Sequence, residues 1–301
     1  MINLNVNNET DPLKSVLLGI ANSSGSIPAL EDCYDPNSLM HVKAGSYPSE
    51  DDMIYEMREL ESVFESYNVK VYRPKLISNY NQIFARDIAF VIEDKLFIPD
   101  IIKERNKEKD GIKYLLDNFE KDEKIIIPED ISIEGGDIII HNNYIFIGYS
   151  NDDKLKVSRT SSKSIPFIQK HFPDKKVLGF DLVKDDNDPY NNILHLDCVM
   201  QPVGKDNIII YEGGFKKKNE LEKLIEIFGE NSIIKISKEE QYDGCSNLFS
   251  INEKTIISDS TFTRLNKILT SKGIKVEKVY YREISKYGGL FRCSTLPLNR
   301  I

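Results

Sequence analysis

The chain has 301 residues, of which 40% are hydrophobic and 29% charged, and it carries a formal net charge of -8. This balance is typical of a globular protein with a substantial core and excludes a disordered chain. The acidic balance argues against binding to nucleic-acid phosphates, which requires a basic face. The first residues lack the features of a secretory signal, and no stretch reaches the roughly 20 apolar residues that span a bilayer. We therefore expect a cytoplasmic protein that binds neither nucleic acid nor a membrane.

The predicted elements, taken in chain order, repeat one unit: two strands joined by a short polar turn, then a helix, then a third strand. Hairpins are predicted at residues 89–99, 137–148, 199–211 and 248–258, with Asx or Gly residues at most turns. The helices that follow them are predicted at residues 101–119, 161–172, 216–228 and 261–271. The third strands are predicted at residues 124–128, 176–180, 232–236 and 276–280.

A fifth, incomplete copy of this unit fits the N-terminus. It has a strand at residues 13–20, a helix at 50–67 and a strand at 69–73. Residues 294–298 can supply its missing strand, and such a closure removes exposed sheet edges from a circular array. We therefore expect a single α/β domain over residues 1–301, with five units around a pseudo-fivefold axis.

Residues that can do chemistry stand just before the hairpins, at equivalent positions of the repeat. They are Arg86-Asp87, Glu134-Gly-Gly-Asp137, His195-Leu-Asp197, Cys245-Ser-Asn247 and Gly288-Gly289-Leu-Phe-Arg-Cys293. Equivalent positions in a ring converge on its axis, so these segments are predicted to form one central pocket. Arg86, Asn247 and Gly289 are candidate substrate-binding residues because they stand in these segments.

Together these groups suit the chemistry of a guanidino group. A guanidinium is a planar cation with several N–H donors, which carboxylates such as Asp87 and Asp197 can hold at its edges. Its carbon is a poor electrophile, and the thiolate of Cys293 is the nucleophile best suited to add there. The imidazole of His195 can protonate a departing amine and then deprotonate the incoming water or amine. Glu134 either binds the guanidinium edge or orients His195, and the sequence leaves both roles open.

Each of these residues also has a structural interpretation. Cys293 can be a buried structural thiol, although the Gly-Gly loop before it and the adjacent Arg292 favour a reactive one. Asp87 can cap a turn, with Arg86 as a surface partner. Of the other cysteines, Cys198 alternates along an apolar strand and is predicted to be core.

Cys33, Cys198, Cys245 and Cys293 are far apart in sequence, without CxxC spacing, so neither a zinc site nor a disulfide framework is indicated. Cys245 stands at an equivalent repeat position. It is therefore left open between the core and the pocket lining.

Five motifs in this order resemble the guanidino-group-modifying (pentein) superfamily, which includes arginine deiminases, dimethylarginine dimethylaminohydrolases and amidinotransferases. The motifs are DPLKSVLL at 11–18, FARD at 84–87, IEGGD at 133–137, HLD at 195–197 and GGLFRCSTLPL at 288–298. The resemblance covers nearly the whole chain and implies a five-bladed α/β propeller of ββαβ modules.

The resemblance also implies roles for the site residues. Cys293 would form a covalent thiouronium intermediate, His195 would be the acid and base, and Asp87, Glu134 and Asp197 would be the guanidinium-binding and catalytic carboxylates. Neither a metal nor an organic cofactor is implied.

The chain departs from arginine deiminases where an Arg-Thr motif that helps to bind the substrate carboxylate follows the second strand. Here seven residues, 151–157, intervene before Ser158-Arg159-Thr160. Arg159 is the candidate ligand for a substrate carboxylate.

The leading hypothesis is a hydrolase of arginine or an arginine derivative, with a small guanidino molecule as its partner. The first alternative is an amidinotransferase, in which an amine resolves the same intermediate. The second alternative is a catalytically idle propeller that binds a guanidino ligand or a protein. A homodimer is possible, and the loop at residues 21–46 is a candidate lid over the pocket.

Overall fold

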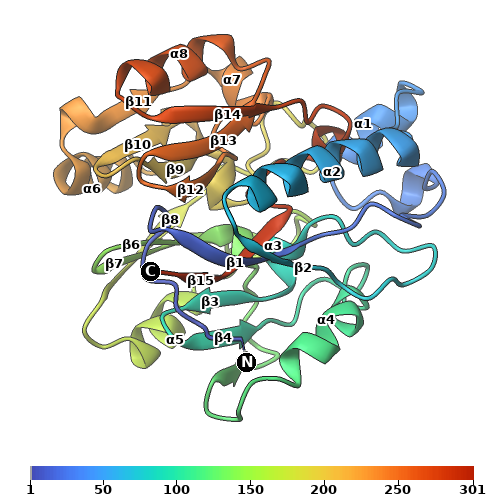
Figure 1. The fold of residues 1–301 in the computed structure, drawn as a ribbon, viewed down its shortest axis with the longest axis horizontal. Helices are drawn as coiled ribbons and strands as arrows, with labels where there is room; N and C mark the ends of the chain where they lie inside the picture. Colours follow the sequence, from blue (N-terminus) through green and yellow to red (C-terminus); the bar gives the residue numbers. More distant parts are fainter. Residues whose placement is uncertain (1) are drawn as a thin grey trace.

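Five small three-stranded sheets form the framework of the computed structural model, which describes residues 2–301 (Figure 1). In every sheet the middle strand is antiparallel to one neighbour and parallel to the other. The strands, sheet by sheet, are β1 (Leu13–Leu18), β2 (Lys70–Tyr72) and β15 (Thr295–Arg300); β3 (Phe90–Ile92), β4 (Lys95–Ile98) and β5 (Lys124–Ile126); β6 (Ile138–His141), β7 (Tyr144–Tyr149) and β8 (Lys176–Asp181); β9 (Met200–Val203), β10 (Asn207–Ile210) and β11 (Ile233–Lys235); and β12 (Phe249–Asn252), β13 (Thr255–Asp259) and β14 (Lys275–Val279).

Helices connect the parallel strands, because a parallel pair cannot be joined by a tight turn. The α-helices are α1 (Pro36–Lys43), α2 (Glu50–Ser66), α3 (Ala85–Ile88), α4 (Glu108–Leu116), α5 (Ser164–His171), α6 (Lys218–Phe228), α7 (Lys238–Tyr242) and α8 (Thr263–Ser271). The 3-10 helices are η1 (Leu30–Asp32), η2 (Gly135–Asp137), η3 (Leu196–Cys198), η4 (Glu212–Gly214), η5 (Glu230–Ser232) and η6 (Ile284–Tyr287). Each sheet receives one crossover helix, and these are α2, α4, α5, α6 and α8.

The predicted closure between the chain ends is confirmed. Strand β15 pairs antiparallel with β1, with Val16 opposite Pro297 and Leu18 opposite Thr295. Figure 1 shows the first strand in blue beside the last in red. The first sheet therefore has the same three-stranded form as the other four.

The four predicted hairpins are also confirmed, and local backbone chemistry explains their turns. Asn142 and Gly204 adopt positive φ angles of 53° and 63° in two of the turns. Asn and Gly adopt this left-handed conformation at low cost, which allows a tight connection between antiparallel strands.

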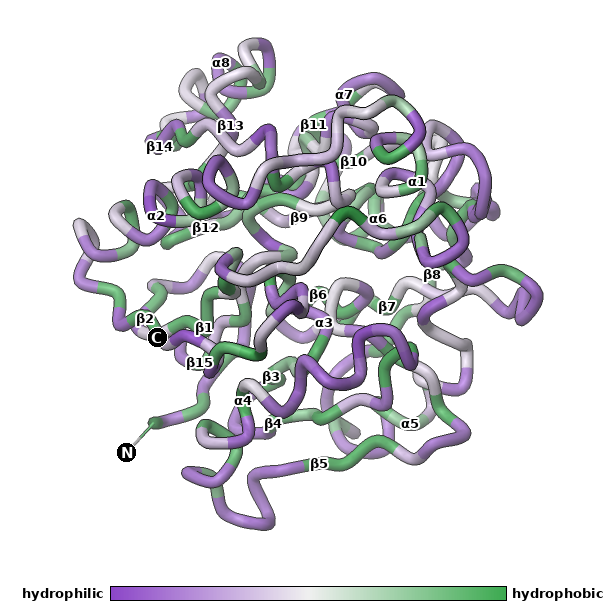
Figure 2. The backbone as a smooth tube through the Cα atoms, turned by 90° about the vertical axis from the view of Figure 1, so that its right-hand side faces the viewer, coloured by the Kyte–Doolittle hydropathy of each residue, from purple (hydrophilic) through white to green (hydrophobic). Residues whose placement is uncertain are grey.

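Helix α2 shows why the crossover helices form where they do. The Ser49 side chain accepts a hydrogen bond from the Asp52 backbone N–H, which caps the first turn and is worth roughly 1 kcal/mol. Buried residues Met53, Met57 and Phe64 then recur at helical spacing on the face that packs against the core. In Figure 2 the hydrophobic stretches follow the strands, while much of the outer connecting chain is hydrophilic.

The helix predicted at residues 101–119 begins later than expected, at Glu108. The preceding residues form turns in which the Arg105 side chain points inward and pairs with Asp87. In the part of the chain that the structure covers, no helix is both long enough and apolar enough to cross a bilayer.

Candidate active site

Segments that precede the first strand of each sheet meet at the centre of the molecule. Helix α3 contacts η2, and η2 contacts η3. This close packing depends on the two glycines of the EGGD motif. A Cβ atom on Gly135 would lie 2.0 Å from the Arg86 carbonyl oxygen, and one on Gly136 would lie 2.6 Å from His195 Nδ1. The sequence therefore places glycine where backbone and side chains of other segments need the space.

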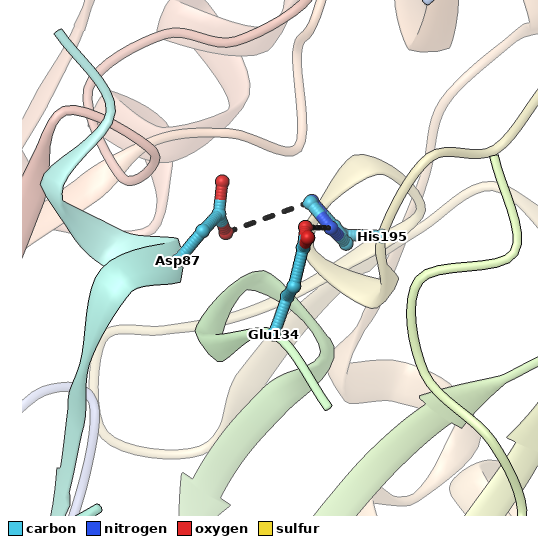
Figure 3. Close-up of side chains that lie close together, drawn as sticks. All are labelled: Asp87, Glu134 and His195. Carbon is cyan, nitrogen blue, oxygen red and sulfur yellow. Dashed lines mark hydrogen bonds and ion pairs between the residues drawn. The ribbon is translucent and has the colours of Figure 1, made fainter. Parts of the chain in front are cut away.

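Asp87, Glu134 and His195 form a buried cluster at this junction (Figure 3). His195 Nε2 lies 2.8 Å from Glu134 Oε2, and His195 Nδ1 lies 3.8 Å from Asp87 Oδ1. Asp87 Oδ1 also accepts a hydrogen bond from the Gly136 N–H, at 3.1 Å. The structure therefore brings together three of the residues that the sequence predicted, and its geometry assigns Glu134 the contact that orients His195.

The charges around the imidazole favour its protonated form. Burial by itself lowers the pKa of His195, but the charges of Asp87 and Asp137 and the hydrogen bond with Glu134 together raise this pKa to about 9. Burial likewise raises the pKa of Glu134, yet Arg159 and His195 hold it well below its usual range. At neutral pH the cluster thus contains an imidazolium, which can donate a proton.

Two buried arginines neutralise the carboxylates of this cluster. Arg105 Nη1 donates to Asp87 Oδ2 at 2.6 Å, and its Nε donates to Glu108 Oε1 at 2.7 Å. Arg159 Nη1 lies 3.4 Å from Glu134 Oε1. Arg105 was missed in the sequence, because it stands in a run of charged residues where nothing marks it as the buried one.

The same cluster is the one group of potential metal ligands found among residues 2–301, with ligand atoms of Asp87, Glu134 and His195 within 4.8 Å of one another. A divalent cation there would compete with the guanidinium groups of Arg105 and Arg159, which already pair with the two carboxylates. The surroundings therefore fit an imidazolium better than a metal ion.

Cys293 is buried beside this cluster and is held by Asn247. Asn247 Nδ2 donates to Cys293 Sγ at 3.2 Å, and its Oδ1 accepts from the Cys293 N–H at 3.1 Å. Burial and the negative charge of Asp197 raise the pKa of the Cys293 thiol well above its usual range. The sequence suggested that the adjacent Arg292 would activate the thiol, but the surroundings favour a neutral thiol.

The Arg292 guanidinium is engaged elsewhere. It donates from Nη1 to Asp197 Oδ2 and from Nη2 to Glu9 Oε1, both at 2.9 Å. The Cys293 thiol contacts the same Asp197 oxygen at 3.7 Å. Asp197 thus lies behind the thiol in an ion pair with Arg292.

A pocket, here called the central pocket, collects several of the predicted residues. Asp87, Arg159, His195, Gly289 and Cys293 all line it. The other lining residues are Tyr34, Asp35, Asn81, Phe84, Arg105, Leu194, Tyr287 and Gly288.

Tyr34 and Asp35 belong to the loop that was proposed as a lid, and the Tyr34 carbonyl accepts from Arg159 Nη2 at 3.1 Å. The free volume is only about 20 Å³. The lining side chains therefore nearly fill the central pocket.

Three predicted substrate-binding residues are absent from this lining. Asp197 and Asn247 lie behind Cys293, as described above. Arg86 is buried, and its Nε donates to the Arg292 carbonyl oxygen at 3.3 Å. The alternative interpretation of Arg86 as a surface partner of Asp87 is therefore wrong, because its guanidinium is buried and contacts the turn before β15.

Two other cysteines can now be placed. Cys198 is not a core residue of a strand, since it lies in η3 and is partly exposed. Cys245 is buried in the hydrophobic core and is not among the residues that line the central pocket.

The family model described as "N,N dimethylarginine dimethylhydrolase, eukaryotic" matches residues 49–300. The chain belongs to this family of the pentein superfamily. An uncharacterized Bacillus subtilis protein, YkgA, is 28% identical over 260 residues, which cover 83% of this chain and 84% of that protein. An arginine deiminase of Bacillus cereus is 26% identical over 265 residues, which cover 73% of this chain but only 62% of that enzyme.

Solved structures confirm the predicted five-bladed propeller. The N-terminal domain of ArgZ, an arginine dihydrolase from cyanobacteria, superposes with a TM-score of 0.78 at 18% identity, covering 95% of this chain and 98% of that one. An inosamine-phosphate amidinotransferase from Streptomyces griseus superposes with a TM-score of 0.76 at 15% identity, covering 100% and 97%. The chain is thus a pentein in fold as well as in sequence.

Proposed function

We propose that the protein is a cysteine-dependent hydrolase that acts on the guanidino group of arginine or an arginine derivative. The observation that carries the proposal is the shared lining of the central pocket: the Cys293 thiol, the His195 imidazole and the Asp87 carboxylate all face it. A nucleophile, a proton donor and an acceptor for guanidinium N–H groups are the groups that this reaction requires.

The arginines of the pocket support a substrate with a negatively charged end. Arg159 uses three of its five N–H donors within the protein, to the Lys156 carbonyl, Glu134 and the Tyr34 carbonyl. One donor remains on each of its two terminal nitrogens, a geometry that suits a carboxylate. The α-carboxylate of arginine would meet this requirement.

Substrate binding would also activate the thiol. A guanidinium next to Cys293 supplies a positive charge that offsets Asp197 and Asp87, so the pKa of the thiol falls when the substrate is bound. The thiol then loses its proton to solvent, and the resulting thiolate adds to the guanidinium carbon. This order protects the resting enzyme, since its thiol stays protonated until a cation arrives.

The proton on His195 completes the first half of the reaction. As the C–N bond breaks, the imidazolium donates its proton to the departing nitrogen, which leaves as a neutral amine. The neutral imidazole then takes one proton from water as the water attacks the thiouronium carbon. The C–S bond breaks as the remaining hydroxyl proton passes to the departing sulfur, which leaves a neutral ureido product and restores the thiol. Glu134 holds the imidazole throughout, through its contact with Nε2.

Amidino transfer is the alternative, because water and an amine compete for the same carbon. The test is to incubate the protein with arginine and with its N-methylated derivatives, with and without glycine or another primary amine, and to identify the products. Citrulline in the absence of an acceptor supports the hydrolase. Ornithine that appears only with an acceptor would replace it with a transferase.

A further inference from the structure

Two carboxylates line the central pocket, and they differ in whether a cation of the protein pairs with them. Asp87 pairs with Arg105, whereas Asp35 forms no ion pair with any Lys, Arg or His among residues 2–301. Asp35 is nevertheless only 9% exposed, and buried charges in proteins are normally paired. Burial accordingly raises the pKa of this carboxyl group. The pocket thus has an acidic group whose charge a cation from outside the protein can balance.

The two oxygens of the Asp35 carboxylate have different surroundings. Oδ1 accepts a hydrogen bond from the Ser38 N–H at 2.8 Å and so caps the first turn of α1. Oδ2 accepts no hydrogen bond within residues 2–301, and it is not enclosed by protein atoms. The cap therefore fixes the direction of the carboxylate, while Oδ2 remains available to a donor in the pocket.

Asp35 also lines a larger space, which we call the acidic chamber. Its free volume is about 160 Å³, and it adjoins the central pocket, because Asp35 and its neighbour Tyr34 line both. Asp32, Glu104 and Glu108 line the chamber too, and no Lys, Arg or His among residues 2–301 does so. A space lined by one sign of charge raises the local concentration of ions of the opposite sign. The acidic chamber therefore attracts cations toward Asp35.

Arg159, the candidate ligand for a substrate carboxylate, is held next to Asp35. Its Nη2 donates to the carbonyl of Tyr34, the residue before Asp35, at 3.1 Å. Its guanidinium lies 5.7 Å from the centroid of the Tyr34 ring. The carboxylate and the ammonium of an amino acid are bonded to one carbon, so a site that binds both needs a cationic donor and an anionic acceptor close together. Arg159 and Asp35 meet this requirement.

We propose that Asp35 binds the ammonium group of the substrate and thereby selects guanidino compounds with a free amino group. This inference deepens the proposed function and rests on it. The ammonium donates to Oδ2, Arg159 holds the carboxylate, and the guanidino end reaches Cys293. Acylation of the amino group removes its charge, so an Nα-acylated arginine would leave Asp35 buried and unpaired. The substrate class is therefore the free amino acid or a simple guanidino amine.

Asp35→Asn tests the charge without removing the cap, because Asn is as good an N-cap residue as Asp. Dissociation constants would be measured by isothermal titration calorimetry in the full chain with Cys293→Ser, which prevents turnover. Arginine carries both charged groups, whereas 5-guanidinopentanoate keeps the carboxylate and lacks the ammonium. Asp35→Asn should weaken the binding of arginine about tenfold, the effect of one hydrogen bond between charged groups. The binding of 5-guanidinopentanoate should change by less than about twofold.

Asp32→Asn is the matched control, because Asp32 is an exposed acid of the same chamber that does not line the central pocket. It should leave the binding of both compounds within about twofold of the parent. An equal loss in Asp32→Asn would overturn the assignment, since the field of the chamber would then explain the effect without a contact to Asp35.

The remaining outcomes separate this inference from the proposed function. A loss confined to arginine in Asp35→Asn supports the inference, and equal losses for the two compounds, or none for arginine, would overturn it. Asp35→Ser, which can also cap a helix, repeats the comparison if Asp35→Asn does not fold. Selective binding of arginine without turnover by the wild type would refute only the proposed function. Turnover of arginine together with equal losses for the two compounds would refute only this inference.

Discussion

The central pocket and a neighbouring cavity, which shares Leu194 and Gly288 with it, differ in charge. Carboxylates, two arginines and His195 line the central pocket, whereas no charged residue among residues 2–301 lines the neighbouring cavity, which Cys198 helps to form. A cation can be held and protons moved in the first, while the second suits an uncharged molecule. The difference teaches that the charged side chains of the site are concentrated on one of two spaces that lie close together.

The two thiols at Asp197 make this contrast at the level of single residues. Cys293 contacts Asp197 Oδ2 and Cys198 contacts Asp197 Oδ1, each at 3.7 Å. Burial and the same carboxylate raise the pKa of both thiols. The carboxylate that both thiols contact therefore does not distinguish the nucleophile. The thiols differ in the pocket that they line, because only Cys293 lines the central pocket, where the substrate cation would bind.

The largest expected effect comes from replacing one of these two cysteines with serine. Cys293→Ser should lower kcat by at least roughly 1,000-fold, because the hydroxyl is a far weaker nucleophile. Cys198→Ser should stay within about threefold of wild type, since Cys198 faces the other space. Steady-state formation of the ureido product measures both. Comparable losses in the two variants would contradict the assignment.

The His195–Glu134 pair should give the next largest effect, of about 100-fold in kcat for Glu134→Gln, within the range for proton-transfer groups. The proton donor is the imidazolium, so kcat of the wild type should fall as pH rises through about 9, the pKa of His195. Removing the Glu134 charge lowers this pKa, which moves the alkaline limb toward neutral pH. A pH profile with an unmoved limb would show that Glu134 does not tune the imidazole.

The same raised pKa affects folding stability with a definite sign. The pKa of His195 is higher in the folded state than its ordinary value of about 6.5. Protonated His195 therefore adds its full contribution to the free energy of unfolding below about pH 6.5. This contribution is lost as pH rises through about 9. The pH dependence of kcat must accordingly be measured at temperatures where the protein stays folded.

A smaller effect is expected from Arg159, the candidate ligand for the substrate carboxylate. Arg159→Lys replaces two free donors in a planar fork with a single ammonium, and it should raise KM for arginine about tenfold. Agmatine, which has the guanidino group but lacks the carboxylate, is the matched control and should show little change in KM. Equal changes for both compounds would indicate that Arg159 acts through Glu134 instead.

The fold was predictable from the sequence because each blade carries its own signals. Turn residues such as Asn142 and Gly204 and the alternation of apolar side chains mark the hairpins, and these are local features. The repeat phase then placed His195, Glu134 and Cys293 near one another. Pairing between residues at opposite ends of the chain, such as β1 with β15, followed from the need to close the ring.

Side-chain direction was not predictable in the same way. His195 precedes η3 and Asp197 lies within it, so one tight helical turn sends the first into the central pocket and the second behind Cys293. Arg105 is buried in an ion pair with Asp87, and Glu9 is buried in an ion pair with Arg292. These partners come together only when the chain folds, so the sequence does not mark either residue as buried. Sequence spacing fixes the position of a backbone segment but not the face that its side chains use.

The smallest expected effect concerns stability and contrasts a buried amide with a buried ion pair. Gln241→Leu should change the free energy of unfolding by less than about 1 kcal/mol, because the lost amide contacts are offset by removal of an unpaired acceptor. Glu9→Gln should cost about 3 kcal/mol, because it leaves the buried Arg292 charge without one of its two carboxylate partners. Urea denaturation at neutral pH measures both values. If Gln241→Leu were as destabilising as Glu9→Gln, the Gln241 amide would have a structural partner in the folded protein.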